Sequence, residues 1–215
     1  MVEEPNGLTF LVNRCLVVFI LEGNPMEAIR RHDELIEAYP DFGALNFWKS
    51  VALVVAGKFE EAIEEARKFV TADGGSSNSR MQLAWVFGAA GKREEAEEIL
   101  SKAIADEEGA FISPAIIGSV KLVLGQKDEG YAWLEKALSE RDPALLYFNG
   151  FPWTKEYRVD PRWAAIEEKL GFASSPDSGS TKSLQNLRSK VGIKKESALS
   201  TLAVAFGVGA YGGRG

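Results

Sequence analysis

Small and apolar residues recur along the chain with a period of 34 residues. One glycine marks the same place in each period, at Gly23, Gly57, Gly91 and Gly125. A fixed period of this length is typical of a helical repeat array, in which each unit is a pair of helices too small to bury its apolar face alone. The pattern therefore predicts an all-α fold: an α-solenoid of about four helix-turn-helix units.

Small side chains stand where the two helices of each predicted hairpin must approach closely. Five residues after the glycine come Ala28, Ala62, Ala96 and Gly130, and seven residues before it come Leu16, Ser50, Ala84 and Gly118. Only Leu16 departs from the small type, and bulk at these positions would push the helices apart. The glycine itself fits a left-handed helix terminus.

These segments resemble tetratricopeptide repeats. The second and third match best, with GKFEEAIEEARKF and GKREEAEEILSKA, while the first reads GNPMEAIRRHDEL and the fourth, GQKDEGYAWLEKA, is weaker. The end of the array also resembles the close of tetratricopeptide arrays appended to prokaryotic signalling proteins and regulators. The resemblance implies a superhelix whose concave face is formed by the first helix of each repeat and carries the ligand.

The period sets the expected domain boundaries. The array covers residues 8–172, and 145–172 form its C-terminal capping helix region, where Asp160 and Pro161 predict a helix start. The expected repeats are about 9–42, 43–76, 77–110 and 111–144. Residues 173–183 have the composition of a linker, and 184–215 form a basic and then apolar tail, expected to be mobile or docked.

Charge is distributed unevenly over a chain whose formal net charge is −6. Residues 1–172 carry 19 Lys+Arg and 29 Asp+Glu, which gives −10, whereas residues 173–215 carry 6 and 2, which gives +4. An acidic body argues against nucleic-acid binding. The single Cys15, an acidic N-terminus and apolar runs shorter than a membrane span predict a cytoplasmic protein without membrane insertion.

The sequence offers few parts for catalysis. His32 and Cys15 fall on register positions that other repeats fill with Ala or Leu and with Leu or Ile, so both are expected in packing roles. The paired glutamates of the second helices are expected on a solvated outer face, with pairs such as Glu64 to Lys68. We therefore expect a protein that is not an enzyme and that has no cofactor and no metal.

The inner face of the first helices is the expected binding surface. Its middle is aromatic and apolar, which suits an amphipathic helix or an extended apolar peptide, with Trp48 and Trp85 as anchors. The candidate groove residues are Asn13, Arg14, Phe47, Trp48, Val51, Asn78, Met81, Gln82, Trp85 and Ile116. Two alternatives stay open: the aromatic residues fill the core, or the apolar tail fills the groove from within the chain.

The predicted function is that of a non-enzymatic scaffold for protein–protein interaction, with a protein or peptide partner. The alternative is a sensory or oligomerisation module of a larger signalling enzyme or transcriptional regulator. Self-association and docking of the C-terminal tail on the array are further possibilities. The sequence does not identify the partner.

Overall fold

The computed structural model describes residues 23–105, 112–148 and 154–171, and within them every regular element is a helix. The helices are α2 (Pro25–Ala38), α3 (Ala44–Val55), α4 (Phe59–Ala72), α5 (Ser77–Ala89), α6 (Arg93–Ala105), α7 (Pro114–Val123), α8 (Lys127–Ser139), α9 (Ala144–Phe148) and α10 (Pro161–Lys169). The predicted all-α class is confirmed. The predictions for Asn13, Arg14, Cys15, Leu16, the linker 173–183 and the tail 184–215 lie outside the described residues.

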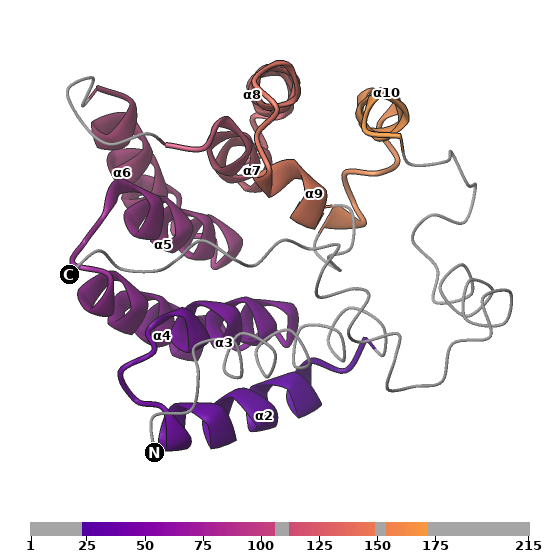
Figure 1. Cartoon of the computed structure of the whole chain (residues 1–215). Coiled ribbons are helices and arrows are strands. Elements are labelled where there is room, and N and C mark those ends of the chain that lie inside the picture. Colours follow the sequence, from indigo (N-terminus) through magenta and orange to yellow (C-terminus); the bar gives the residue numbers. More distant parts are fainter. Residues whose placement is uncertain (1–22, 106–111, 149–153, 172–215) are drawn as a thin grey trace, which may run out of the picture.

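The helices pack in pairs that follow one another along a curve. α3 packs on α4, α5 on α6 and α7 on α8, and the first helices α3, α5 and α7 contact one another in succession. Figure 1 shows the pairs winding from α2 (indigo) to α8 and α10 (orange), with α4, α6 and α8 on the outer side of the curve. This arrangement is the predicted solenoid.

Each hairpin turn is closed by the glycine that marks the period. Gly57, Gly91 and Gly125 have φ of 75°, 76° and 77°, the left-handed conformation in which a side chain is unfavourable. The residue after the glycine donates its N–H to a carbonyl five residues earlier, as Lys58 does to Leu53 at 2.9 Å. These bonds satisfy the last carbonyls of the first helix, so the predicted helix terminus is confirmed.

The small residues of the repeat lie at the contact between the helices of each pair. Ala62, Ala84 and Ala96 have no exposed surface, and neither has Ser50. In the fourth pair, a Cβ on Gly130 would come within 2.7 Å of Leu122 Cγ. The predicted close approach is therefore present in all three described pairs, and it is tightest between α7 and α8.

Side-chain caps begin several of the helices. Ser76 and Ser113 accept the N–H of the residue three positions ahead, and so does Asn24 at the start of α2. Asp160 accepts the N–H of Arg162, with Pro161 in the first turn of α10. The helix start predicted at Asp160 is confirmed, because the carboxylate satisfies a donor that the helix itself leaves unpaired.

Polar side chains attach the C-terminal segment to the fourth pair. Asp142 is buried, and its carboxylate accepts from Ser113 Oγ at 2.5 Å, from the Ala115 N–H at 3.1 Å and from the Ala144 N–H at 3.0 Å. The Tyr131 hydroxyl donates to the carbonyl of Tyr157 at 2.7 Å. These bonds hold residues 154–158 and the start of α9 in fixed positions relative to α7 and α8.

Candidate functional site: a pocket on the inner face

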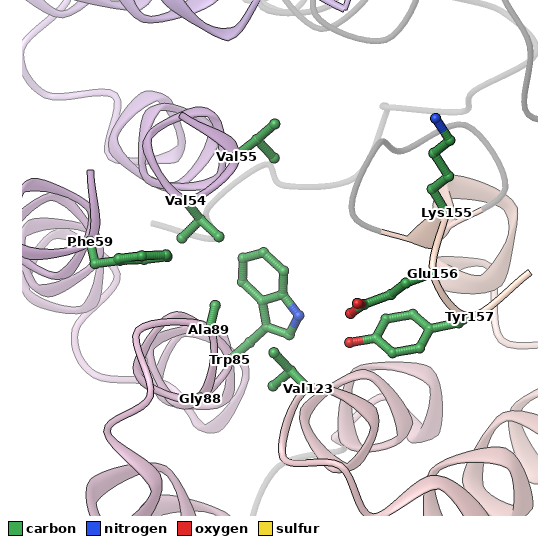
Figure 2. A pocket seen from close by; sticks show the side chains of 10 residues that line it. All are labelled: Val54, Val55, Phe59, Trp85, Gly88, Ala89, Val123, Lys155, Glu156 and Tyr157. Atoms are coloured by element: carbon green, nitrogen blue, oxygen red, sulfur yellow. The ribbon is translucent and has the colours of Figure 1, made fainter. Parts of the chain in front are cut away.

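An open pocket of about 650 Å³ lies on the inner face of the array. The first helices and Phe59 at the start of α4 form one wall, and residues after α9 form the other. The lining side chains are Val54, Val55, Phe59, Trp85, Gly88, Ala89, Val123, Lys155, Glu156 and Tyr157. Figure 2 shows the Trp85 indole between the valines of α3 and the Glu156–Tyr157 segment. The volume is in the range of sites that bury a small molecule or a few side chains of a peptide.

The helical wall is built from one register position in three successive repeats. Val55, Ala89 and Val123 each stand two residues before the glycine of their repeat, and all three line the pocket. Gly88 allows α5 and α7 to approach here, since a Cβ on Gly88 would lie 2.6 Å from Val123 Cγ1. The ends of three helices thus meet in a continuous apolar surface.

The opposite wall is held in place by α8. Thr154 donates its hydroxyl to the carbonyl of Phe148 at 2.9 Å, and Tyr131 bonds the carbonyl of Tyr157. Burial raises the pKa of Tyr131 to about 12 and raises the pKa of Tyr157 as well, with a further contribution from Glu156. Both phenols are therefore neutral at physiological pH. Lys155 and Glu156 are exposed and put one charge of each sign at the pocket.

The candidate groove residues fall into different environments. Trp85 lines the pocket. Ile116 lies on α7, is half-buried and does not line the pocket. Phe47 and Trp48 are half-buried, with ring centroids 4.7 Å apart, and Phe47 also packs on Phe69 of α4 at 5.5 Å. These two rings belong in part to the core.

Two further candidates are almost fully buried. Val51 has an exposed fraction of 1% and Met81 of 0%, and both belong to the main hydrophobic cluster. Their side chains therefore present no surface to a partner in this structure. Asn13 and Arg14 precede the described residues.

Two amide side chains on α5 have buried oxygens that accept no hydrogen bond from the described residues. They are Asn78 Oδ1 and Gln82 Oε1. Asn78, Gln82, Trp85 and Ala89 are spaced by four, three and four residues, so they share one face of the helix. Trp85 and Ala89 line the pocket. Gln82 and Asn78 therefore lie on the same face of α5, one and two helical turns before Trp85. A buried acceptor without a donor is unfavourable, so this face can gain energy by pairing with N–H groups.

Sequence reasoning missed most of the pocket lining. Val55 and Val123 lie one to two helical turns after the predicted groove positions of α3 and α7, on the same face of each helix. Extending the predicted groove to the helix ends would therefore have found them. No periodic signal could have found Lys155, Glu156 and Tyr157, because they follow the last repeat and reach the pocket only through the fold.

The histidine considered for chemistry has a structural role. His32 has an exposed fraction of 1% and donates its Nδ1–H to the carbonyl of Ala28 at 2.7 Å, and burial lowers its pKa. The predicted packing role of His32 is confirmed. Among the described residues, no group of three or more His, Cys, Asp or Glu side chains could hold a metal ion. No helix of that part of the chain combines the length and apolar content of a membrane span.

The glutamates of the second helices are mostly exposed, but one is not. Glu65 is buried, and its carboxylate pairs with Lys68 at 2.9 Å and with Lys49 at 3.0 Å. The predicted ion pair between Glu64 and Lys68 is therefore wrong. Lys49 also pairs with Asp33 at 2.7 Å. Burial alone would lower the pKa of Lys49, but the hydrogen bonds with Asp33 and Glu65 outweigh it and raise the pKa. The cluster joins α2, α3 and α4.

Comparison with known families supports the architecture. The family model described as Tetratricopeptide repeat matches residues 22–77, which contain α2, α3 and α4. A comparison with curated proteins finds no match. Repeats of this family generally mediate protein–protein interaction. The matched residues, the left-handed glycines at the hairpin turns and the paired packing of the following helices support a tetratricopeptide-like repeat architecture for the described helices.

Proposed function

We propose that the protein is a non-catalytic interaction module that binds an extended apolar segment of a partner protein along the inner face of α5. The observation that carries this proposal is the apolar pocket at Trp85, formed by the same register position of three repeats. The apolar wall would bury side chains of the segment, and burial of apolar surface supplies most of the free energy of such association.

The buried amides favour an extended segment over a helix. In a helix the backbone N–H groups are already bonded within the element, whereas an extended chain presents them free. Asn78 Oδ1 and Gln82 Oε1 would accept from such groups, while the pocket takes an apolar side chain beside Trp85. Phe47, Trp48 and Ile116 would contribute the flanking contacts.

A charge placed on the pocket wall tests this site. In Val55→Lys the ammonium would enter the apolar pocket, and its position at the end of α3 keeps the charge compatible with the helix dipole. Val159→Lys is the matched control, because Val159 is 84% exposed and does not line the pocket. Circular dichroism would check that both variants keep their helices.

Binding is measured with a displayed library of random peptides selected on the wild-type chain. We expect enrichment of uncharged apolar sequences, about tenfold or greater loss of affinity in Val55→Lys, which corresponds to about 1.4 kcal/mol, and unchanged affinity in Val159→Lys. Equal affinity in both variants would place the binding site elsewhere.

A further inference from the structure

We infer that the pocket at Trp85 takes a segment of the same chain, the uncharged stretch Ala198–Tyr211, so that the protein covers its own binding site until a partner displaces this segment. The inference rests on the proposed function of the pocket and names the regulation of that site. Three observations carry it: the composition of the stretch, the position where the described chain ends, and the charge of its flank.

The composition of the stretch matches the pocket. Residues 198–211 read ALSTLAVAFGVGAY and contain no charged residue, which sets them apart from a chain that is 26% charged. Leu202, Val204 and Phe206 supply apolar side chains of the size that a pocket of about 650 Å³ accommodates. Burial of these side chains in the pocket would be favourable in free energy, because it removes apolar area from water.

The described chain ends soon after one pocket wall in the sequence. Residues 155–157 form that wall, and α10 follows and ends at Lys169. A helix of nine residues is about 14 Å long, so Gly171 lies at most about 35 Å from Tyr157 along the chain. The residues between Gly171 and Ala198 can span up to about 90 Å when extended. The stretch can therefore reach the pocket in the same chain, at a high effective concentration.

The flank of the stretch has the opposite charge to the array. Lys190, Lys194 and Lys195 precede Ala198, with Glu196 between them and the stretch, and residues 173–215 carry a net charge of +4 against −10 for residues 1–172. At the pocket wall Lys155 and Glu156 are both exposed and carry opposite charges, so the attraction comes from the net charge of the array rather than from the wall itself. The attraction favours docking on the array and is screened by salt.

Photo-crosslinking in the full chain tests the inference. Benzoylphenylalanine is incorporated in place of Phe206, the protein is irradiated at micromolar concentration, and the product is mapped by mass spectrometry. We expect a crosslink within one chain to α3, α5 or α7 near Val55, Trp85 or Val123. The yield should fall at least fivefold in the Val55→Lys background and stay unchanged in the Val159→Lys background.

Other outcomes overturn the inference. A crosslink to a surface away from the pocket, or none, shows that the stretch does not occupy the site. A crosslinked dimer whose yield rises with concentration shows that a second copy supplies the stretch.

A second variant separates this inference from the proposed function. In Leu202→Glu/Phe206→Glu the stretch carries two charges, and the described array is unchanged. If the stretch occupies the pocket, library peptides should bind this variant about tenfold more tightly than the wild-type chain, because the competing segment is removed. Equal affinity overturns the inference and leaves the proposed function intact. A pocket that crosslinks to position 206 but binds no library peptide in either chain supports the inference and contradicts the proposed function.

Discussion

The second and third repeats and the fourth repeat with its cap reach similar packing by different means. In α3–α6 the helices approach over Ala and Ser side chains with no exposed surface. In α7 and α8 the same positions are Gly118 and Gly130, and a Cβ at either would come within 3 Å of its neighbours. The fourth pair departs most from the repeat pattern, yet it is the most closely packed. A weak repeat in the sequence is therefore not a loose repeat in the fold.

The fourth pair also adapts at other positions. Lys121 stands where the second and third repeats have Leu53 and Phe87. Its side chain is 14% exposed and its ammonium pairs with Glu129 at 2.8 Å. The aliphatic part of the Lys121 side chain is therefore buried, while its ammonium group stays beside the exposed Glu129. The following predictions test this comparison between the middle and the end of the array.

The largest expected effect comes from filling the contact between α7 and α8. Gly130→Leu should lower the free energy of unfolding by about 3 kcal/mol, because overpacking of a closely packed contact forces the helices apart. Urea denaturation followed by circular dichroism measures it. Ala132→Leu on the exposed face of α8 is the control and should have little effect. Helix propensity alone would make Gly130→Ala stabilising by about 1 kcal/mol, so a stabilised Gly130→Ala would contradict the close approach.

The next largest effect concerns the hydrogen bonds by which Asp142 attaches the C-terminal segment to α7. Asp142→Ala should lower the free energy of unfolding by about 2 kcal/mol, because it leaves the Ser113 hydroxyl and two backbone N–H groups without their acceptor. Residues 112–171 should also exchange their amide hydrogens faster, as mass spectrometry would report. Asp142→Asn keeps one acceptor oxygen, so it should lower the free energy of unfolding by less than Asp142→Ala does. If exchange rose equally in α3 and α4, the cap would not be a separate stabilising unit.

A side chain at a left-handed glycine of a hairpin turn should destabilise the array. Gly91→Ala should destabilise by about 1 kcal/mol, since the methyl group meets no atom but the φ of 76° disfavours any side chain. Thermal unfolding would show a lower midpoint. Gly57→Ala should lose a similar amount if the turns of the second and third repeats are equivalent.

Arg141 holds the left-handed position at the end of α8, with φ of 56°. Arg141→Gly should raise the free energy of unfolding by up to about 1 kcal/mol, because glycine adopts this conformation without the steric penalty. The same thermal unfolding experiment measures it. A loss of stability would mean that the Arg141 side chain makes a contribution larger than its backbone strain.

The smallest effect is a pH dependence confined to the first described hairpin. His32 is the single histidine of the chain, and burial lowers its pKa below the ordinary 6.5. The Ala28 carbonyl and Asp33 oppose this shift, and Lys49 adds to it. The unfolded chain therefore binds a proton that the folded chain rejects, and the free energy of unfolding should fall as pH falls below about 6.5. The slope is at most about 1.4 kcal/mol per pH unit. His32→Leu should remove this slope between pH 7 and 6, and an unchanged slope would show that His32 accepts its proton in the fold.

Sequence alone determined the period, the fold class and the hairpin turns. These follow from local rules: a left-handed terminus requires glycine at Gly57, Gly91 and Gly125, and two helices can approach closely only over small side chains such as Ala62 and Ala96. Such rules repeat with the unit, so four copies of one signal were readable without tertiary information. The start of α10 at Asp160 occurs once, but it was readable because an N-cap carboxylate followed by proline is also a local signal.

Only the tertiary structure decided which side chains form the pocket. Whether an apolar residue of a first helix is core or surface depends on the neighbouring repeat, so Val51 and Met81 were indistinguishable from Trp85 in the sequence. The segment of Glu156 and Tyr157 has no periodic signal, and it reaches the pocket because Asp142 and Tyr131 anchor the chain on the fourth pair. Local preferences repeat along the chain, whereas a pocket depends on how curved pairs and the last segment meet in space.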